Sequence, residues 1–219
     1  MNPINLLVQN IMLPFLIYSY HHIYPNYGVS IILLTLIVKI IFYPLTHKQF
    51  KSLSVQKEIQ PEIKEIQEKF KGQPEKLQKE MTAVWKKYNM NPLSGCLPTL
   101  IQLPVFIAVF YTIKSTDFLA LIAEPGINPG LFSFWLSNLG QPDTTYILPI
   151  FIGIITYITQ KLMTTDPKQA KIFAFMPFLM VVICLKMPAG VLLYWAASQG
   201  LSAIQQILIM KKIEAKKEK

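Results

Sequence analysis

The chain has 219 residues, 52% of them hydrophobic and only 15% charged, with a mean hydropathy of +0.37. Several apolar runs approach the length of a membrane span, and a soluble domain of this size could not bury them all. The formal net charge of +9 comes from lysine, because the sequence has no arginine. These lysines lie beside the apolar runs, which makes specific nucleic-acid binding a weak explanation. Cys96 and Cys184 imply no disulfide framework.

Residues 1–26 form the first predicted element, an apolar segment without charged side chains and with Pro14 inside it. Its polar positions, among them Asn5 and Gln9, favour a helix that lies in the outer membrane interface. A sixth membrane span over residues 4–20 is the alternative. The segment lacks the basic start and cleavage site of a secretory signal peptide, so we expect none.

The second element, 27–46, is a predicted membrane span with a lysine near its middle. Lys39 lies about 16 Å along a helix from the start of the apolar run, which places it near the bilayer midplane. A charged side chain there costs about 2.5–3.5 kcal/mol, so it normally faces water or a partner. Thr35 and Tyr43 share its helix face, and Tyr43-Pro44 is expected to end the span. Snorkelling of the lysine to the nearer interface is the simpler alternative.

Residues 47–91 have the composition of an exposed antiparallel helical hairpin, with ten lysines and six glutamates. Two narrow apolar stripes fit two amphipathic helices, with Gly72 and Pro74 at the turn between them. The stripe of the first helix is Ile59, Ile63, Ile66 and Phe70, and that of the second is Leu77, Met81, Val84 and Tyr88. The segment is longer than a connector between neighbouring spans needs to be, so we expect a working part on the cytoplasmic side.

Four further spans are predicted at 93–113, 145–163, 170–187 and 189–210, with an external loop at 114–144 and a basic tail at 211–219. The topology follows from the lysines, because cytoplasmic segments of membrane proteins are enriched in basic residues. Lysine is abundant in 47–91, in 211–219 and around Lys161 and Lys168, but not in 1–27 or 114–144. We therefore expect the N-terminus outside and the C-terminus in the cytoplasm.

Polar side chains gather inside the predicted spans. Gln102 in the second span reaches a depth in the membrane similar to that of Lys39. The last span carries one stripe of polar residues, and the third span adds two polar residues. These residues are Tyr194, Ser198, Ser202 and Gln205 in the last span and Thr156 and Gln160 in the third. Serine and threonine alone often only join helices. Together with a lysine, and with no acidic residue in any span, they predict a hydrated groove open to the cytoplasm. A polar stretch of a newly made protein, the client, could enter it at a reduced desolvation cost while its apolar stretch leaves sideways into lipid.

Short motifs occur along the chain in the order and spacing of a known family. They are NYG (26–28), TLIVK (35–39), YPLT (43–46), QPEI (60–63), NPLSGCLP (91–98), IQLP (101–104), DPKQAK (166–171), PAGVLLYW (188–195) and QQ (205–206). Over nearly its whole length the sequence resembles the YidC/Oxa/Alb family of membrane protein insertases.

The resemblance implies an all-α polytopic membrane protein. Five transmembrane helices would enclose a groove open to the cytoplasm and to lipid but closed outside. It also implies that the hairpin receives nascent membrane proteins, and that the tail or loops meet the ribosome or a Sec translocon. The family's groove positions correspond to Thr35, Lys39, Gln102, Tyr194 and Trp195, and the polar stripe adds Ser198. Many members have arginine in place of Lys39. One branch carries a large external domain after the first span, and this chain resembles the short form without it. We expect no cofactor, metal or catalytic residue.

Other function classes fit less well. A solute transporter or channel predicts intramembrane carboxylates or an internal repeat, and the sequence has neither. A membrane-anchored scaffold would explain the hairpin but not Lys39. An intramembrane enzyme is disfavoured because GxSxG, HExxH and GxGxxG motifs are absent and the histidines lie at span edges. The bacterial plasma membrane is the expected location, with an organellar inner or thylakoid membrane as the alternative.

Overall fold

The computed structural model describes residues 3–88, 97–132, 135–163 and 167–217, and these ranges are mostly helical without a β-strand. The N-terminal helices are α1 (Pro3–Leu7), the π-helical η1 (Val8–Met12) and α2 (Leu13–His22). The remaining helices are α3 (Tyr27–Glu58), α4 (Gln60–Lys69), α5 (Pro74–Lys87), α6 (Leu97–Lys114), α7 (Thr116–Ala123), α8 (Ile147–Met163), α9 (Pro167–Cys184) and α10 (Ala189–Lys217).

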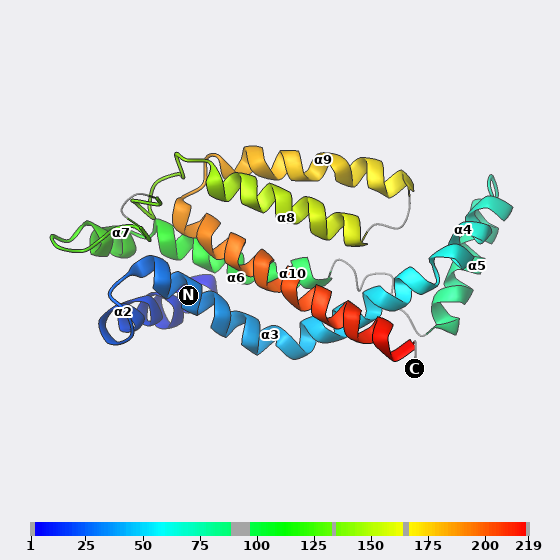
Figure 1. The fold of residues 1–219 in the computed structure, drawn as a ribbon, viewed down its shortest axis with the longest axis horizontal. Coiled ribbons are helices and arrows are strands. Elements are labelled where there is room, and N and C mark those ends of the chain that lie inside the picture. Colours follow the sequence, from blue (N-terminus) through cyan, green and yellow to red (C-terminus); the bar gives the residue numbers. More distant parts are fainter. Residues whose placement is uncertain (1–2, 89–96, 133–134, 164–166, 218–219) are drawn as a thin grey trace.

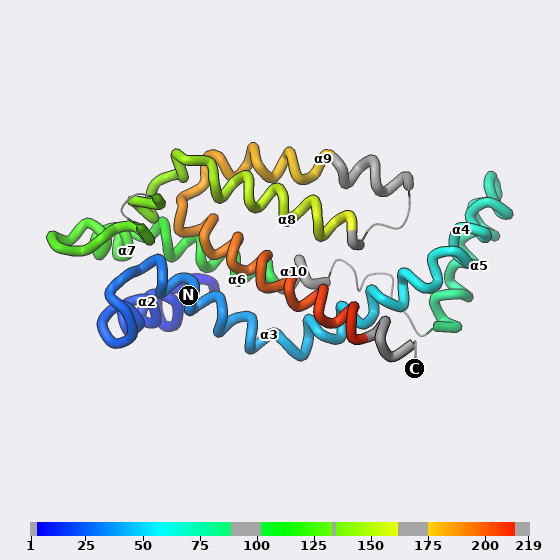
Figure 2. Tube along the Cα trace, in the orientation of Figure 1, coloured from blue at the N-terminus to red at the C-terminus, as the bar shows by residue number. Residues whose placement is uncertain are grey.

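Helix α10 occupies the centre of the arrangement. It packs against α3 and α8 and, more lightly, against α6, while α9 lies along α8 (Figure 1). Helix α6 also packs against η1, and α2 packs against α3. Helices α4 and α5 extend from one end of α3, far from the N-terminal helices and α7 at the opposite end (Figure 2). The long helices therefore run between the end that carries α4 and α5 and the end that carries α7.

Helix α3 begins at a side-chain cap and runs through a proline. Asn26 precedes the helix, and its side-chain oxygen accepts a hydrogen bond from the backbone N–H of Val29 at 3.1 Å, which satisfies a free donor of the first turn. The sequence places the end of the first span at Tyr43-Pro44, yet the helix itself continues through Pro44 to Glu58. The Thr46 hydroxyl donates to the carbonyl of Tyr43, in its own helix, at 3.0 Å.

Length and composition identify fewer spanning helices than the sequence predicts. Within the described residues, α3 is the one helix long and apolar enough to cross a membrane, or there are two such segments if the bent pair of Gln102–Lys114 and Thr116–Ala123 is a single span. That pair bends by 51°, and Ile147–Lys161 and Phe175–Cys184 are shorter apolar helices. A helix nevertheless lies in each of the five predicted ranges. Five spans therefore stay a prediction.

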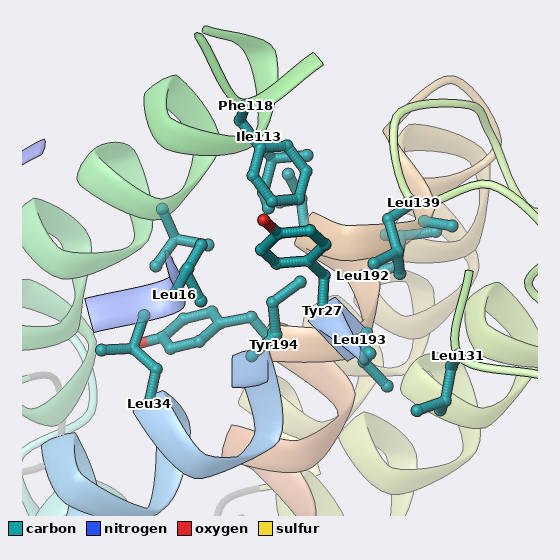
Figure 3. Close-up of a cluster of buried hydrophobic side chains, with 14 of the residues drawn as sticks. Leu16, Tyr27, Leu34, Ile113, Phe118, Leu131, Leu139, Leu192, Leu193 and Tyr194 are labelled. Atoms are coloured by element: carbon teal, nitrogen blue, oxygen red, sulfur yellow. The ribbon is translucent and has the colours of Figure 1, made fainter. Parts of the chain in front are cut away.

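The main hydrophobic core lies at the end that holds α2 and α7. Tyr27 is fully buried, stacks on Tyr20 with ring centroids 4.4 Å apart, and meets the ring of Phe118 edge-on at 5.5 Å. Leu16 and Leu192 also belong to this core (Figure 3). The N-terminal segment is part of it, because Val8, Met12, Leu13 and Leu16 are buried. The exposed Gln9 donates to the carboxylate of Asp117 in α7 at 3.3 Å, and the interfacial position of this segment stays a prediction.

The loop before α8 ties together the starts of three helices. The Asn26 side chain donates to the carbonyl of Leu131 at 3.1 Å, and the first N–H group of α10, on Ala189, donates to the carbonyl of Gln141 at 2.7 Å. The buried Asp143 accepts a bond from the N–H of Leu148 in the first turn of α8 at 2.9 Å. These bonds fix the ends of α3, α8 and α10 to one loop.

Helices α4 and α5 pack against each other through some residues of the predicted apolar stripes. Ile59, Ile63 and Val84 are buried together, with Ile66 and Met81 beside them. Val55 and Trp85 also join this cluster, whereas Phe70, Leu77 and Tyr88 do not. At the turn, Gly72 has a φ of +88° and Pro74 begins α5, as the sequence predicts.

An ion pair joins α4 to α5. The Lys87 ammonium lies 2.9 Å from the Glu62 carboxylate, and the Tyr88 hydroxyl donates to the same carboxylate at 3.0 Å. The hydrogen bond from Lys87 and then that from Tyr88 hold the pKa of Glu62 below its usual range. The bond to Glu62 likewise raises the pKa of Lys87.

Candidate functional site

The polar stripe of α10 faces two neighbouring helices. Tyr194, Ser198, Ser202 and Gln205 recur at intervals of three or four residues, so they share one side of the helix. Three of the four make hydrogen bonds to other helices: one to α6 and two to α3. The stripe therefore forms the polar contact of α10 with the helices on either side of it.

Lys39 turns toward α10. Its ammonium donates a hydrogen bond to the Ser202 hydroxyl at 2.8 Å, and its side chain is partly buried. The next residue, Ile40, is 71% exposed and lies on another face of α3. An ammonium surrounded by apolar side chains needs polar partners, and α10 supplies one that is neutral.

Closer to the hairpin, a second polar pair joins α3 to α10. The Gln205 amide donates to the Thr46 hydroxyl at 2.9 Å, and the amide oxygen lies 3.2 Å from that hydroxyl. Thr46 lies two helical turns beyond Lys39, so both pairs occupy the same side of α3. The two contacts fix which residues of α3 and α10 lie opposite each other.

Gln102 connects α6 to the same stripe. Its amide donates to the hydroxyl of Tyr194, whose side chain is 1% exposed. Trp195, the next residue, is partly buried and meets the ring of Phe106 in α6 edge-on, with centroids 5.1 Å apart. The N-terminal half of α10 is thus held to α6 by one polar and one aromatic contact.

The predicted groove residues differ in how deeply they are buried. Thr35 is fully buried and donates to the carbonyl of Ile31 in its own helix at 2.7 Å. Ser198 is 4% exposed. Thr35, Tyr194 and Ser198 are therefore packed, whereas Lys39 and Gln102 are partly accessible. Tyr43, predicted to share the helix face of Lys39, is 52% exposed and stacks with His47.

Sequence reasoning missed Gln49. Its side chain is 4% exposed, and neither its amide nitrogen nor its oxygen makes a hydrogen bond. It lies three residues beyond Thr46, on the same side of α3. The prediction that the span ends at Pro44 hid this position, because the helical periodicity has to be continued past the proline to find it.

Charge separates the two ends of the molecule. Exposed lysines occur on α3 beyond Pro44 and near the ends of α8 and α10, among them Lys48, Lys51, Lys161 and Lys211. The opposite end, which carries α7 and the loop before α8, holds Asp117, Glu124 and Asp143 together with the exposed Lys114 and Lys186, so lysine is not in excess there. A helical membrane protein oriented by its lysines would place the α4–α5 end in the cytoplasm.

The chain matches a known protein family over most of its length. A family model described as "60Kd inner membrane protein" matches residues 18–217. The chain belongs to this YidC/Oxa1 family. The resemblance inferred from the motifs is confirmed.

Curated relatives carry the name "Membrane protein insertase YidC". That of Helicobacter pylori (strain ATCC 700392 / 26695) is 40% identical over 195 residues, which is 88% of this chain and 34% of the relative. That of Wolinella succinogenes is 40% identical, over 88% of this chain and 35% of the relative. The chain spans about a third of the length of the curated relatives it matches.

A solved structure described as an active YidC insertase with its first transmembrane domain resolved is also similar. It matches with a TM-score of 0.71 and 28% sequence identity, over 90% of this chain and 45% of that chain. This match confirms the predicted helical fold class.

Proposed function

We propose that the chain is a membrane protein insertase and chaperone, which inserts newly made membrane proteins and helps them to fold. The observation that carries the proposal is the Lys39 ammonium, held by Ser202 inside the contact between α3 and α10. Relatives in this family are named as membrane protein insertases.

In this proposal α3, α6, α8, α9 and α10 are five transmembrane helices around a hydrophilic groove. The excess of exposed lysines at the α4–α5 end supports a cytoplasmic hairpin and tail, and an N-terminus outside. Thr35, Tyr194 and Ser198, which are buried, form the closed inner wall of the groove, while Lys39, Gln102 and Trp195 line its accessible part. The N-terminal helices lie at the outer membrane interface.

The mechanism lowers a desolvation barrier and needs no catalytic group. A polar stretch of the client loses water when it enters the membrane, which costs several kcal/mol unless other polar groups replace the water. The groove supplies such groups and a positive charge, which favours acidic and carbonyl-rich segments. The apolar segment of the client then leaves sideways into lipid, where burial of its side chains stabilises the inserted state.

The partners follow from this role. The clients are nascent membrane proteins, received by the α4–α5 hairpin. The lysines of the hairpin and of residues 211–219 would meet the ribosome, whose RNA is negatively charged. The chain would act alone or beside a Sec translocon, in the bacterial plasma membrane in which we place it.

The test is insertion of a single-spanning client with an acidic external segment into proteoliposomes that contain only this chain. Wild type and Lys39→Arg should insert it, whereas Lys39→Ala and Lys39→Glu should insert progressively less. Lys48→Ala is the matched control, because it removes an exposed lysine from the same helix. If wild-type protein that is correctly folded inserts no more than empty liposomes, the proposed activity is wrong.

A further inference from the structure

Two polar pairs occupy the contact between α3 and α10, and they follow the same order along both helices. Lys39 bonds Ser202 at 2.8 Å, and Thr46 bonds Gln205 at 2.9 Å. Ser202 and Gln205 are three residues apart on α10, and Lys39 and Thr46 are seven apart on α3. The spacing is larger on α3, and the four-carbon stem of the lysine is long enough to span the difference.

The Lys39 side chain is flexible enough to place its ammonium at more than one depth along α3. Its flexible four-carbon stem lets the ammonium move toward the nearest water. Thr46 lies about 10 Å farther along α3 toward the lysine-rich end, so a free ammonium would drift in that direction. The Ser202 hydroxyl instead gives it a fixed acceptor on α10.

We propose that Ser202 is a positioning residue: it fixes the depth at which the Lys39 charge stands in the groove. The Thr46–Gln205 pair keeps α3 and α10 in the register that brings Ser202 within reach. The inference rests on the proposed function only where it concerns insertion, since the position of the ammonium can be measured without a client. The competing explanation is that Ser202 merely joins two helices, as serine often does in membranes.

The first test measures the acylation rate of Lys39 by peptide-resolved mass spectrometry, using an amine-reactive ester on the full chain in liposomes. Ser202→Ala should raise that rate about threefold or more, because loss of an average hydrogen bond between membrane helices shifts an equilibrium by about that factor. Lys48 and Lys51, both exposed on α3, serve as internal references and should not change. Ser202→Thr, which keeps the hydroxyl, should restore the wild-type rate.

Ser202→Cys is the second variant, because it is nearly isosteric and offers a weaker acceptor. It should give an intermediate rate with little disturbance of packing, and it serves if Ser202→Ala fails to fold. A Lys39 rate equal to wild type in folded Ser202→Cys and Ser202→Ala would overturn the proposal. A rise at Lys39, Lys48 and Lys51 alike would also overturn it, since that pattern means general loosening of α3.

The second test asks whether the effect of Ser202 on insertion passes through Lys39. In the wild-type background Ser202→Ala should reduce client insertion about threefold, and in a Lys39→Met background it should reduce it no further. Ser54→Ala is the control, because the Ser54 hydroxyl bonds only its own helix, at the carbonyl of Lys51. Equal losses in both backgrounds would show that Ser202 acts through packing and would contradict the proposal. If Lys39→Met inserts as well as wild type while the acylation shift is present, positioning holds and the role of Lys39 in insertion fails.

Discussion

Replacing Gly28 with alanine should loosen the end of the molecule that carries α2 and α7. A Cβ atom on Gly28 would lie 2.7 Å from both Cβ and Cδ1 of Leu131, and 2.9 Å from its Cα. Leu131 has little freedom to withdraw, because its carbonyl accepts the Asn26 side chain at 3.1 Å and its N–H donates to Leu136 at 3.0 Å. The alanine variant must therefore push the loop away from α3.

The magnitude follows from two opposing effects. Overpacking of this kind costs about 1–3 kcal/mol, while alanine gains about 0.5–1 kcal/mol over glycine in a helix. The free energy of unfolding of Gly28→Ala should thus fall by about 1–2 kcal/mol. Gly200 in α10 is the matched control, because the nearest atom to an added Cβ is Cδ1 of Ile155 at 4.0 Å. Gly200→Ala should keep the full helical gain.

The assay is thermal unfolding of the purified variants in the same detergent at one scan rate, since unfolding of membrane proteins is commonly irreversible. In a chain of this size 1 kcal/mol corresponds to about 2–4 °C. The apparent Tm of Gly28→Ala should therefore drop by about 2–8 °C, and that of Gly200→Ala should rise by up to about 4 °C. A Gly28→Ala variant as stable as Gly200→Ala would refute the close approach of loop and helix.

Three further outcomes follow from single contacts. The lowered pKa of Glu62 means that its carboxylate stabilises the α4–α5 hairpin above the usual carboxyl range, and that this contribution disappears as pH falls through the lowered pKa. Amide-exchange protection of α4 should drop there in wild type but stay flat in Glu62→Gln, and equal profiles would exclude the Lys87 pair as the cause. Asp143→Ala should lower the apparent free energy of unfolding by about 1–2 kcal/mol, because the first turn of α8 loses its cap, whereas an unchanged Tm would contradict that role. Tyr194→Phe should cost about 1–3 kcal/mol by leaving the partly buried Gln102 amide without its acceptor, and no loss of stability would mean that water replaces the hydroxyl.

The sequence predicts the helical segments well, because apolar runs and narrow stripes carry that information locally. Residues 47–91 show this: the stripe positions Ile59, Ile63 and Val84 are the ones that the hairpin buries. The ion pair between Glu62 and Lys87 was not predicted, since it joins residues 25 positions apart. Such a contact depends on how two helices meet, and periodicity within one helix does not contain it.

The candidate site was predicted as a set of residues but not as a set of contacts. Lys39 and the polar stripe of α10 are visible as polar groups within apolar runs. That Lys39 meets Ser202 depends on the register between α3 and α10. The continuation of α3 past Pro44 hid Gln49 in the same way, and the loop around Leu131 has no periodic pattern that would reveal its contact with Gly28.

The central claim is that a positive charge at Lys39 receives the polar segment of the client, and a charge exchange tests it most directly. Insertion into proteoliposomes would be measured for wild type and Lys39→Glu, each with a client whose external segment carries either two acidic or two basic residues. The account predicts that Lys39→Glu loses the acidic client and gains the basic one, while Lys48→Glu changes neither. The same client preference in wild type and Lys39→Glu would contradict it.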